Sequence, residues 1–359
     1  MALACSITLA VHVVFILIAS DGSHSMAEGV PRVLIPGLMG NLSNQRWTIM
    51  NTILAGRHWN ASIVIPPWKV SDDTETGAYS PAAQYAMTWT LWDVKHLEEM
   101  AAVNHLKIHM PSREEYAELC PEWLHGTALQ DAIEGLKGGH LHSLCMASDY
   151  SFYQLWRDVL SDIPGIERDV VASIHPMEWH KWYLNSGHFH WARSYLRPSP
   201  RILQQAKEAA SEIHALYGVS YFFALHHRQG DFASSCNAWG DTAIDGMKCY
   251  VSPNETYDVL YRVYRIPERV VLLIAPPQPL HSLGKLCQSY QCVHREMLPH
   301  FMKATEGLMP MVLAQYQFAL AMQSARAFGN IYSSWSVELV ANMRLAGKPA
   351  DVINPHTCM

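Results

Sequence analysis

Apolar and polar positions along the chain form blocks that predict strands followed by helices. A short apolar run at 31–36 predicts a strand, and helical spacing of apolar residues over 45–57 predicts a helix after a polar loop. A second buried strand is expected at 63–65, where a proline pair ends it. The expected buried stripe of the helix is Trp47, Ile49, Met50, Ile53 and Leu54. Strand, helix and strand in this order form a βαβ unit, which builds parallel sheets.

The second half of the chain repeats this alternation after two prolines, Pro198 and Pro200. The elements expected there are a helix at 201–216, strands at 218–225 and 269–275, and helices at 311–326 and 337–345. The region 105–195 is rich in tryptophan and histidine and gives no secure assignment. The sequence therefore predicts an α/β protein in two halves, with a domain boundary near residue 198.

The first residues differ from the rest, because no side chain from Ala2 to Ala19 carries a fixed charge and most are apolar. Small polar residues follow, which predicts a signal peptide over 1–22. An uncleaved signal anchor is the alternative, because the stretch approaches the roughly 18 residues that can span a bilayer. We therefore expect the lumen of the endoplasmic reticulum or Golgi, with membrane attachment only if the segment stays uncleaved.

Composition narrows the class of protein. The 359 residues are 49% hydrophobic and 16% charged, which favours folded domains over disorder. A net charge of −6 gives no basic excess that would favour nucleic acid as a partner. In an oxidising lumen the cysteines favour disulfides, and Cys287 and Cys292 are close enough for a local loop. The other pairings stay open, and sequons at Asn41, Asn60 and Asn254 permit glycosylation.

A cluster of polar residues follows the strand expected at 218–225. It contains His226, Arg228, Gly230 and Asp231. Ligands bind at the carboxyl ends of strands in open α/β sheets, and a guanidinium fork suits phosphate oxygens. A surface salt bridge is the alternative explanation of this arginine.

Two further loops suit an anion. The loop at 37–44 is rich in glycine and small polar residues and lies at a helix start, where free N–H groups favour negative charge; a simple tight turn is the alternative. Ser333, Ser334 and Ser336 lie at the start of the last helix, and N-capping alone explains one serine of the three. Histidine pairs with alternating spacing occur, but no carboxylate or cysteine accompanies them, so no metal site is expected.

Three stretches in this order resemble the GDP-fucose protein O-fucosyltransferases. The first runs from Gly40 to Gln45 and continues to the Pro-Pro-Trp ending at 66–68. The second is the H-x-R motif at 226–228 with Cys236, and the third runs from Gln315 to Ser334. The resemblance spans roughly 30–350 and is weak between about 100 and 195.

The resemblance implies a GT-B fold, in which two facing Rossmann-like domains hold the sugar donor in their cleft. Residues 28–197 would form the acceptor-side domain and residues 198–359 the nucleotide-sugar domain. The implied activity is inverting transfer of L-fucose from GDP-fucose to a hydroxyl of a protein or glycan acceptor, with no obligatory cofactor or metal.

The resemblance also implies roles for individual residues. Arg228 would hold the diphosphate and stabilise the leaving GDP, and Asn44 would lie near the sugar and the acceptor hydroxyl. These two residues are the expected catalytic pair. The implied donor-binding residues are Gly40, Asn41, Leu42, Ser43, Asn44, His226, Arg228, Gln317, Ser333 and Ser334.

The chain departs from the family at positions that bear on donor choice. Gln317 stands where the family has an acidic residue that reads guanine, and an amide accepts only through its oxygen. Ala325 replaces a second acid, and no carboxylate beside Asn44 offers a general base. Two alternatives therefore stay open: a relative that uses another nucleotide sugar, and a protein that binds a nucleotide sugar or glycan without catalysis.

Overall fold

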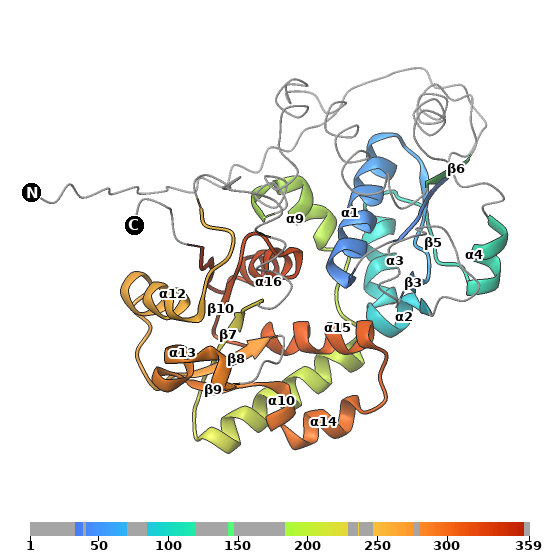
Figure 1. The fold of residues 1–359 in the computed structure, drawn as a ribbon. Helices are drawn as coiled ribbons and strands as arrows, with labels where there is room; N and C mark the ends of the chain where they lie inside the picture. Colours follow the sequence, from blue (N-terminus) through green and yellow to red (C-terminus); the bar gives the residue numbers. More distant parts are fainter. Residues whose placement is uncertain are drawn as a thin grey trace, which may run out of the picture.

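The computed structural model describes residues 33–38, 41–69, 85–119, 143–146, 184–228, 236, 247–275 and 280–354. In Figure 1 the N-terminal elements, blue to cyan, lie on one side of the molecule and the C-terminal elements, orange to red, on the other. The predicted leader at 1–22, Gly40, Gly230 and Asp231 lie outside the described residues. The predicted division at residue 198 stays a prediction.

The first sheet has four parallel strands in the order β5-β2-β1-β6. Its strands are β1 (Val33–Pro36), β2 (Ser62–Val64), β5 (Ile108–His109) and β6 (Ser143–Met146). The chain starts in the middle of this sheet, moves to one edge and then returns to the other side of β1. A small antiparallel pair, β3 (Trp68–Lys69) and β4 (Tyr85–Ala86), comes between β2 and β5 in the chain. The predicted βαβ unit is confirmed.

The second sheet has five parallel strands in the order β11-β10-β7-β8-β9. Its strands are β7 (Phe223–His226), β8 (Val271–Ala275), β9 (Gln291–Val293), β10 (Arg326–Gly329) and β11 (Ala350–Val352). Here too the chain order reverses beside the first strand, between β7 and β10. Both sheets therefore have the doubly wound arrangement that places a topological switch point at their centre.

Helices connect the strands of both sheets. They are α1 (Leu42–His58), α2 (Thr88–Leu91), α3 (Val94–Val103), α4 (Arg113–Leu119), α9 (Gly187–Arg193), α10 (Pro200–Tyr217), α12 (Pro253–Asp258), α13 (Lys285–Ser289), α14 (Pro299–Thr305), α15 (Pro310–Ala321) and α16 (Ser334–Leu345). Single-turn helices occupy 259–263, 280–283 and 295–297. Figure 1 shows α1, α9 and α16 side by side near the centre of the molecule, and hydrogen bonds join both α1 and α9 to α16.

Helix α1 begins at Leu42, three residues before the predicted start. Asn41 forms its N-cap, because Oδ1 accepts from the backbone N–H groups of Ser43 and Asn44 at 3.1 and 3.2 Å. The five apolar residues predicted as a buried stripe are all buried, but so are Arg46 and other polar residues on the opposite faces. A helix buried on every side is packed between layers rather than lying at a surface.

Two predicted boundaries in the second half were wrong. The strand expected from Gly218 begins only at Phe223, because Gly218 ends α10 in the left-handed region at φ 63°. The helix expected to reach Arg326 ends at Ala321, and Lys348 binds the carbonyl oxygens of the turn that follows it. The chain then forms the unpredicted strand β10. Strands β9 and β11 were also not predicted.

Two disulfides join cysteines of the described residues. Cys287 bonds to Cys292 across the tight connection before β9, as the spacing predicted. Cys236 bonds to Cys249, a pairing that the sequence left open. The second bond ties the segment after β7 to the chain near residue 249.

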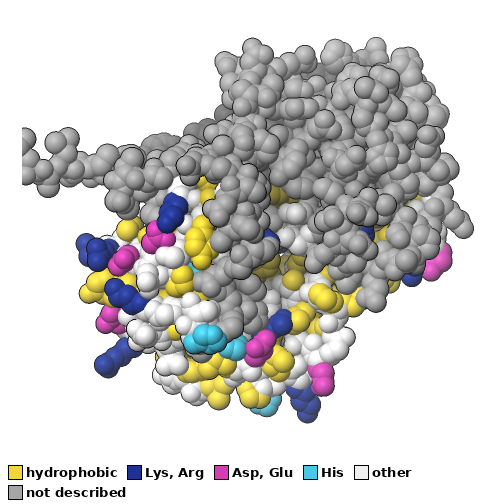
Figure 2. All heavy atoms as spheres, in the orientation of Figure 1, with side chains coloured by type: hydrophobic (Ala, Val, Ile, Leu, Met, Phe, Trp, Pro, Cys, Tyr) yellow, Lys and Arg dark blue, Asp and Glu magenta, His cyan; other side chains and the backbone are white. Residues whose placement is uncertain are grey.

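Among the side chains that Figure 2 colours by type, basic and acidic groups are interspersed on this face. This agrees with the low net charge. Among the described residues, no helix combines the length and apolar character required to cross a bilayer.

Candidate functional site

The switch point of the second sheet lies where β7 and β10 run side by side. Phe328 of β10 pairs with Leu225 of β7, so the two strands reach their carboxyl ends together. His226 is the last residue of β7, and Asn330 directly follows β10. The sheet thus brings the predicted second and third motifs to one place, where open α/β sheets bind ligands.

His226 is fixed on two sides by residues of helix α16. Its Nδ1 lies 2.6 Å from Oγ of Ser336, and its ring stacks on Trp335 with centroids 4.4 Å apart and planes at 26°. Burial, the Arg228 guanidinium and His227 lower the pKa of His226 to about 3. The imidazole is therefore neutral at physiological pH.

Ser336 connects the histidine to the backbone after β10. Its Oγ accepts from the N–H of Asn330 at 2.9 Å, while lying 2.6 Å from the His226 imidazole. Ser336 is fully buried, so its hydroxyl hydrogen requires a partner, and Nδ1 of His226 is the acceptor within reach. In this arrangement Nε2 of His226 carries the ring hydrogen and can donate to a ligand oxygen.

The N-terminus of α16 lies at the same edge of the sheet. Ser333 is the N-cap, and its side chain makes no capping hydrogen bond, while Ser334 is the first helical residue. Asn330 organises the turn before them: its Oδ1 accepts from Tyr332 N and its Nδ2 donates to Cys249 O at 2.8 Å. Helix N-termini attract anions, so this edge suits a phosphate.

Arg228 follows β7 by two residues and is half-buried. The charge of the Arg228 guanidinium is, after burial, a cause of the lowered pKa of His226. Arg228, His226 and the start of α16, which belong to the second and third motifs, thus lie at one switch point. The arrangement offers one fixed cation and several hydrogen-bond donors to an anionic ligand.

The other predicted residues lie at the switch point of the first sheet. Strand β1 leads through 37–41 into α1, and β1 pairs with β2 on one side and β6 on the other. Asn41 is exposed, Asn44 is half-buried in the first turn, and Leu42 and Ser43 are buried. Since Leu42 turns its side chain into the core, only its backbone could meet a ligand.

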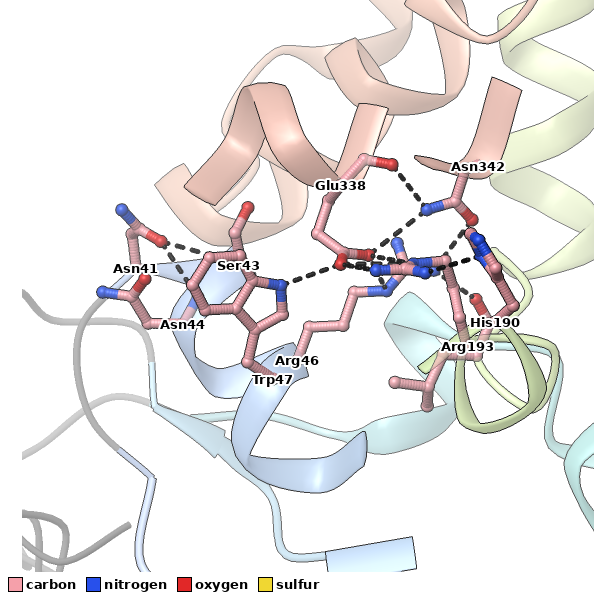
Figure 3. Close-up of polar contacts among 10 residues, drawn as sticks. Asn41, Ser43, Asn44, Arg46, Trp47, His190, Arg193, Glu338 and Asn342 are labelled. Carbon is pink, nitrogen blue, oxygen red and sulfur yellow. Dashed lines mark hydrogen bonds and ion pairs between the residues drawn. The ribbon is translucent and has the colours of Figure 1, made fainter. Parts of the chain in front are cut away.

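Helices α1 and α16 bring the two switch points together. Trp47 of α1 donates from Nε1 to Oε1 of Glu338 of α16 at 2.8 Å, and Figure 3 shows this contact beside Asn44. Along the helix axes, Asn44 lies about 4.5 Å from Trp47, and Ser334 about 6 Å from Glu338, at about 1.5 Å per residue. Both helix starts therefore lie near this contact.

Gln317 lies in α15 and is half-buried. The side-chain amide is oriented with its oxygen towards the donors of Arg295. In this orientation the oxygen accepts from Nε and NH1 of Arg295 at 3.0 and 2.6 Å. The residue expected to meet the guanine edge is thus held by a guanidinium of the same half of the protein. A nucleotide base would have to share or displace that contact.

Sequence reasoning missed several residues that build this site. Trp335 and Ser336 hold His226, but nothing in the sequence showed which serine of the cluster would do so. Arg46 and Glu338 connect the two halves, and the only sequence signal was a charged residue at 46 inside a helix of otherwise apolar spacing. The described residues contain no group of three or more histidine, cysteine or acidic side chains placed to hold a metal ion.

Solved structures of POFUT1 share this fold. The complex of POFUT1 with GDP matches with a TM-score of 0.53 and 12% identity, covering 91% of this chain and 99% of that chain. The complex with GDP-fucose matches with a TM-score of 0.52 and 14% identity, covering 91% and 98%. No protein-family model and no curated protein sequence matches the chain. At this identity the likeness shows the fold, and the expected GT-B architecture is confirmed.

Proposed function

We propose that this protein is an inverting glycosyltransferase that transfers L-fucose from GDP-fucose to a hydroxyl of a protein or glycan acceptor. The observation that carries the proposal is the juxtaposition of both switch points, one with Arg228, His226 and the start of α16, the other with Asn44. The shared fold with a protein solved in complex with GDP-fucose supports the choice of donor.

The chemistry assigned to each group follows from its environment. Arg228 binds the diphosphate and stabilises the charge that develops on GDP as the bond to fucose breaks. Neutral His226 donates a hydrogen bond from Nε2 to the nucleotide, and Ser333 and Ser334 present N–H and hydroxyl groups at the helix start. Gly40, Asn41, Leu42 and Ser43 are assigned to the wall of the donor cleft.

Asn44 is assigned to the reacting centre, where its amide orients the sugar and the acceptor hydroxyl. Attack of the hydroxyl oxygen on the face opposite the departing GDP inverts the anomeric carbon, and the hydroxyl proton passes to water or to a phosphate oxygen of the departing GDP. Among the described residues that Figure 3 labels around Asn44, the acidic side chain is Glu338, and its carboxylate is paired with Arg46 and Arg193. The rate therefore rests mainly on leaving-group stabilisation, and no metal or other cofactor is required.

We further propose that the protein works in the lumen of the secretory pathway. The Cys236–Cys249 and Cys287–Cys292 disulfides support an oxidising compartment. The apolar segment at 1–22 supports entry into that route.

Gln317 favours a second candidate donor. Its amide oxygen is engaged by Arg295, and an amide accepts more weakly than a carboxylate from the N1–H and N2–H₂ groups of guanine. A donor with another base, such as UDP-rhamnose, is therefore the rival that Gln317 favours, while GDP-mannose, which keeps guanine, is a rival that Gln317 does not distinguish from GDP-fucose.

A donor panel decides between these candidates. Purified protein is scanned for thermal stabilisation by GDP-fucose, GDP-mannose and UDP-sugars, each at about 100 times an assumed Kd, where binding adds about 2.7 kcal/mol to the free energy of unfolding. Labelled GDP-fucose and a set of folded-domain and glycan acceptors then test transfer. Stabilisation by GDP-fucose with fucosylated product supports the proposal; selective stabilisation by another nucleotide sugar favours the rival. Stabilisation by no nucleotide contradicts both.

A further inference from the structure

A buried cluster of charges joins α1, α9 and α16, and we name it the Glu338 cluster after its central carboxylate. Arg193 of α9 donates from Nε to both carboxylate oxygens at 3.1 and 3.2 Å and from NH2 at 2.7 Å. Arg46 of α1 forms an ion pair from Nε to Oε2 at 3.1 Å, and Trp47 completes the group. Figure 3 shows all three side chains converging on Glu338.

The carboxylate stays ionised in this environment. Burial alone raises the pKa of Glu338, but the charges of Arg193 and Arg46 and the hydrogen bonds from Arg193 and Trp47 bring it down to about 2. Two guanidinium groups therefore share one carboxylate, all of them almost completely shielded from water. The desolvation of such buried charges is costly, so the cluster contributes little net free energy of unfolding. We therefore ask which residues the cluster holds in place.

Arg46 contacts both halves of the protein at once. Its guanidinium lies between two rings, 5.1 Å from the centroid of Trp92 and 5.3 Å from that of Phe318 of α15. NH2 donates to the carbonyl oxygen of Leu196 at 3.1 Å and to Oδ1 of Asn342 of α16 at 3.0 Å. A planar, five-donor group is suited to this combination, and lysine cannot reproduce it.

A chain of ring contacts leads from Arg46 to the proposed donor site. Phe318, which lies under the Arg46 guanidinium, meets Trp335 edge-on with centroids 5.5 Å apart and planes at 82°. Trp335 in turn stacks on His226 at 4.4 Å. Two packed rings thus connect the Arg46 guanidinium with the histidine at the end of β7.

The same spacing occurs on both helices. Arg46 follows Asn44 by two residues on α1, and Glu338 follows Ser336 by two residues on α16. Two residues correspond to about 3 Å along a helix axis. The Arg46–Glu338 ion pair therefore joins the two helices within about 3 Å, along each helix axis, of Asn44 and of Ser336.

We propose that Arg46 and Glu338 are positioning residues for glycosyl transfer, which hold Asn44 in register with the His226–Ser336 pair. This inference rests on the proposed function. The alternative is that the cluster only stabilises the fold. The two hypotheses predict different results when the cluster is weakened. If the cluster only stabilises the fold, turnover per folded molecule stays unchanged. If it positions residues, turnover falls while the affinity for GDP stays the same.

The experiment compares wild-type protein with Arg46→Met, Arg46→Lys, Glu338→Gln and Trp47→Phe. Calorimetry gives the Kd for GDP, and release of GDP from saturating GDP-fucose gives kcat, at a temperature where circular dichroism shows each variant folded. We expect Arg46→Met to lose about 100-fold in kcat, since small misplacements of reacting groups cost that much. Arg46→Lys, which keeps the charge, recovers part of the loss. The Kd for GDP stays within about threefold, because the phosphate contacts remain.

Asp351→Asn is the matched control. It breaks another arginine–carboxylate pair, in which NH2 of Arg326 lies 2.6 Å from Asp351, but this pair lies within the second sheet. We expect its kcat to stay within about twofold of wild type, as for distant independent sites. Should Glu338→Gln not fold, Arg46→Lys and Trp47→Phe decide the question, because each removes part of the contact.

The outcomes separate the two claims. Wild-type kcat in folded Arg46→Met, Arg46→Lys and Trp47→Phe overturns the positioning role and leaves the proposed function intact. Parallel loss of GDP affinity and kcat also overturns it, because the cluster would then support the donor site as a whole. Wild-type protein that neither binds GDP nor turns over GDP-fucose overturns the proposed function itself.

Discussion

Oγ of Ser336 lies 2.6 Å from Nδ1 of His226, so a residue of the last long helix fixes the orientation of the histidine that ends β7. The same oxygen accepts the N–H of Asn330. This single hydroxyl therefore ties together the strand, the turn and the helix that form the proposed nucleotide site.

Replacing Ser336 with alanine tests that arrangement. Ser336→Ala leaves the Asn330 N–H and the His226 ring nitrogen without their buried partner, and we expect a loss of about 1–3 kcal/mol in the free energy of unfolding. GDP affinity should fall about tenfold, equivalent to about 1.4 kcal/mol, because the imidazole is no longer oriented. Denaturant unfolding and calorimetry measure the two effects.

Ser211→Ala is the control for this substitution. Ser211 is exposed on α10, where its hydroxyl donates to Lys207 O at 3.0 Å. We expect the free energy of unfolding to change by less than about 0.5 kcal/mol, as for an ordinary surface substitution, and the GDP affinity to stay unaltered. Equal effects of the two serine substitutions would contradict the role assigned to Ser336.

The buried histidine also predicts how stability depends on pH. The pKa of His226 is about 3 in the folded protein, against an ordinary value of about 6.5 in the unfolded chain. Between these values the unfolded chain binds the proton and the folded protein does not, so stability is complete above about pH 6.5 and falls as the pH is lowered. His190, whose pKa burial and Arg193 lower to about 4, acts in the same direction.

Unfolding by urea at pH 7, 6 and 5 measures this dependence. The contribution of His226 approaches at most about 1.4 kcal/mol per pH unit. His226→Asn keeps a polar group near the position of Nδ1 but does not titrate, so its stability should fall less steeply with acidification. Identical slopes for the variant and the wild type would show that His226 is not held neutral.

Gly329 provides a test of packing between β10 and α16. A β-carbon at this position would lie 2.6 Å from Cβ and 3.1 Å from Cα of Ser336, and a backbone contact of that kind cannot relax by rotation of a side chain. Gly329→Ala should therefore destabilise the protein by about 1–3 kcal/mol, as overpacking does, and should also weaken GDP binding by shifting Ser336.

Gly187→Ala is its counterpart, because a β-carbon there meets nothing within 4 Å. We expect this substitution to change the free energy of unfolding by less than about 0.5 kcal/mol. A thermal scan of both variants suffices, and a stable Gly329→Ala protein with full GDP affinity would show that the strand and helix are less closely packed than described.

The parts of the fold that sequence predicted are those with an unbroken local signal. Val271–Ala275 is a run of buried apolar residues, and α10 has proline at its start and glycine at its end, so both were predicted nearly in place. Strand β10 has only Ala327 and Phe328 as apolar residues and follows a helix without a breaker, so its helical extension was a natural error. Its identity as a strand depends on pairing with β7.

The candidate site likewise contains residues that the sequence could suggest and residues that it could not. Arg228 and His226 could be proposed because they follow a recognisable strand, and Asn44 because its loop resembles the family's first motif. Arg46 could not be assigned, since its partner Glu338 lies almost 300 residues away and charged residues are rarely fully buried unless paired. The Cys236–Cys249 bond was equally inaccessible, because several pairings were compatible with the spacing.

The central claim is that the carboxyl end of β7 binds the diphosphate of a nucleotide sugar and stabilises its departure. Turnover of GDP-fucose by Arg228→Ala, measured as GDP release beside the wild type, tests it most directly. Removal of the only cation assigned to the leaving group should lower kcat at least about 100-fold, as loss of one such stabilising group does, with an unchanged unfolding temperature. A folded Arg228→Ala protein that retains wild-type turnover would contradict the account.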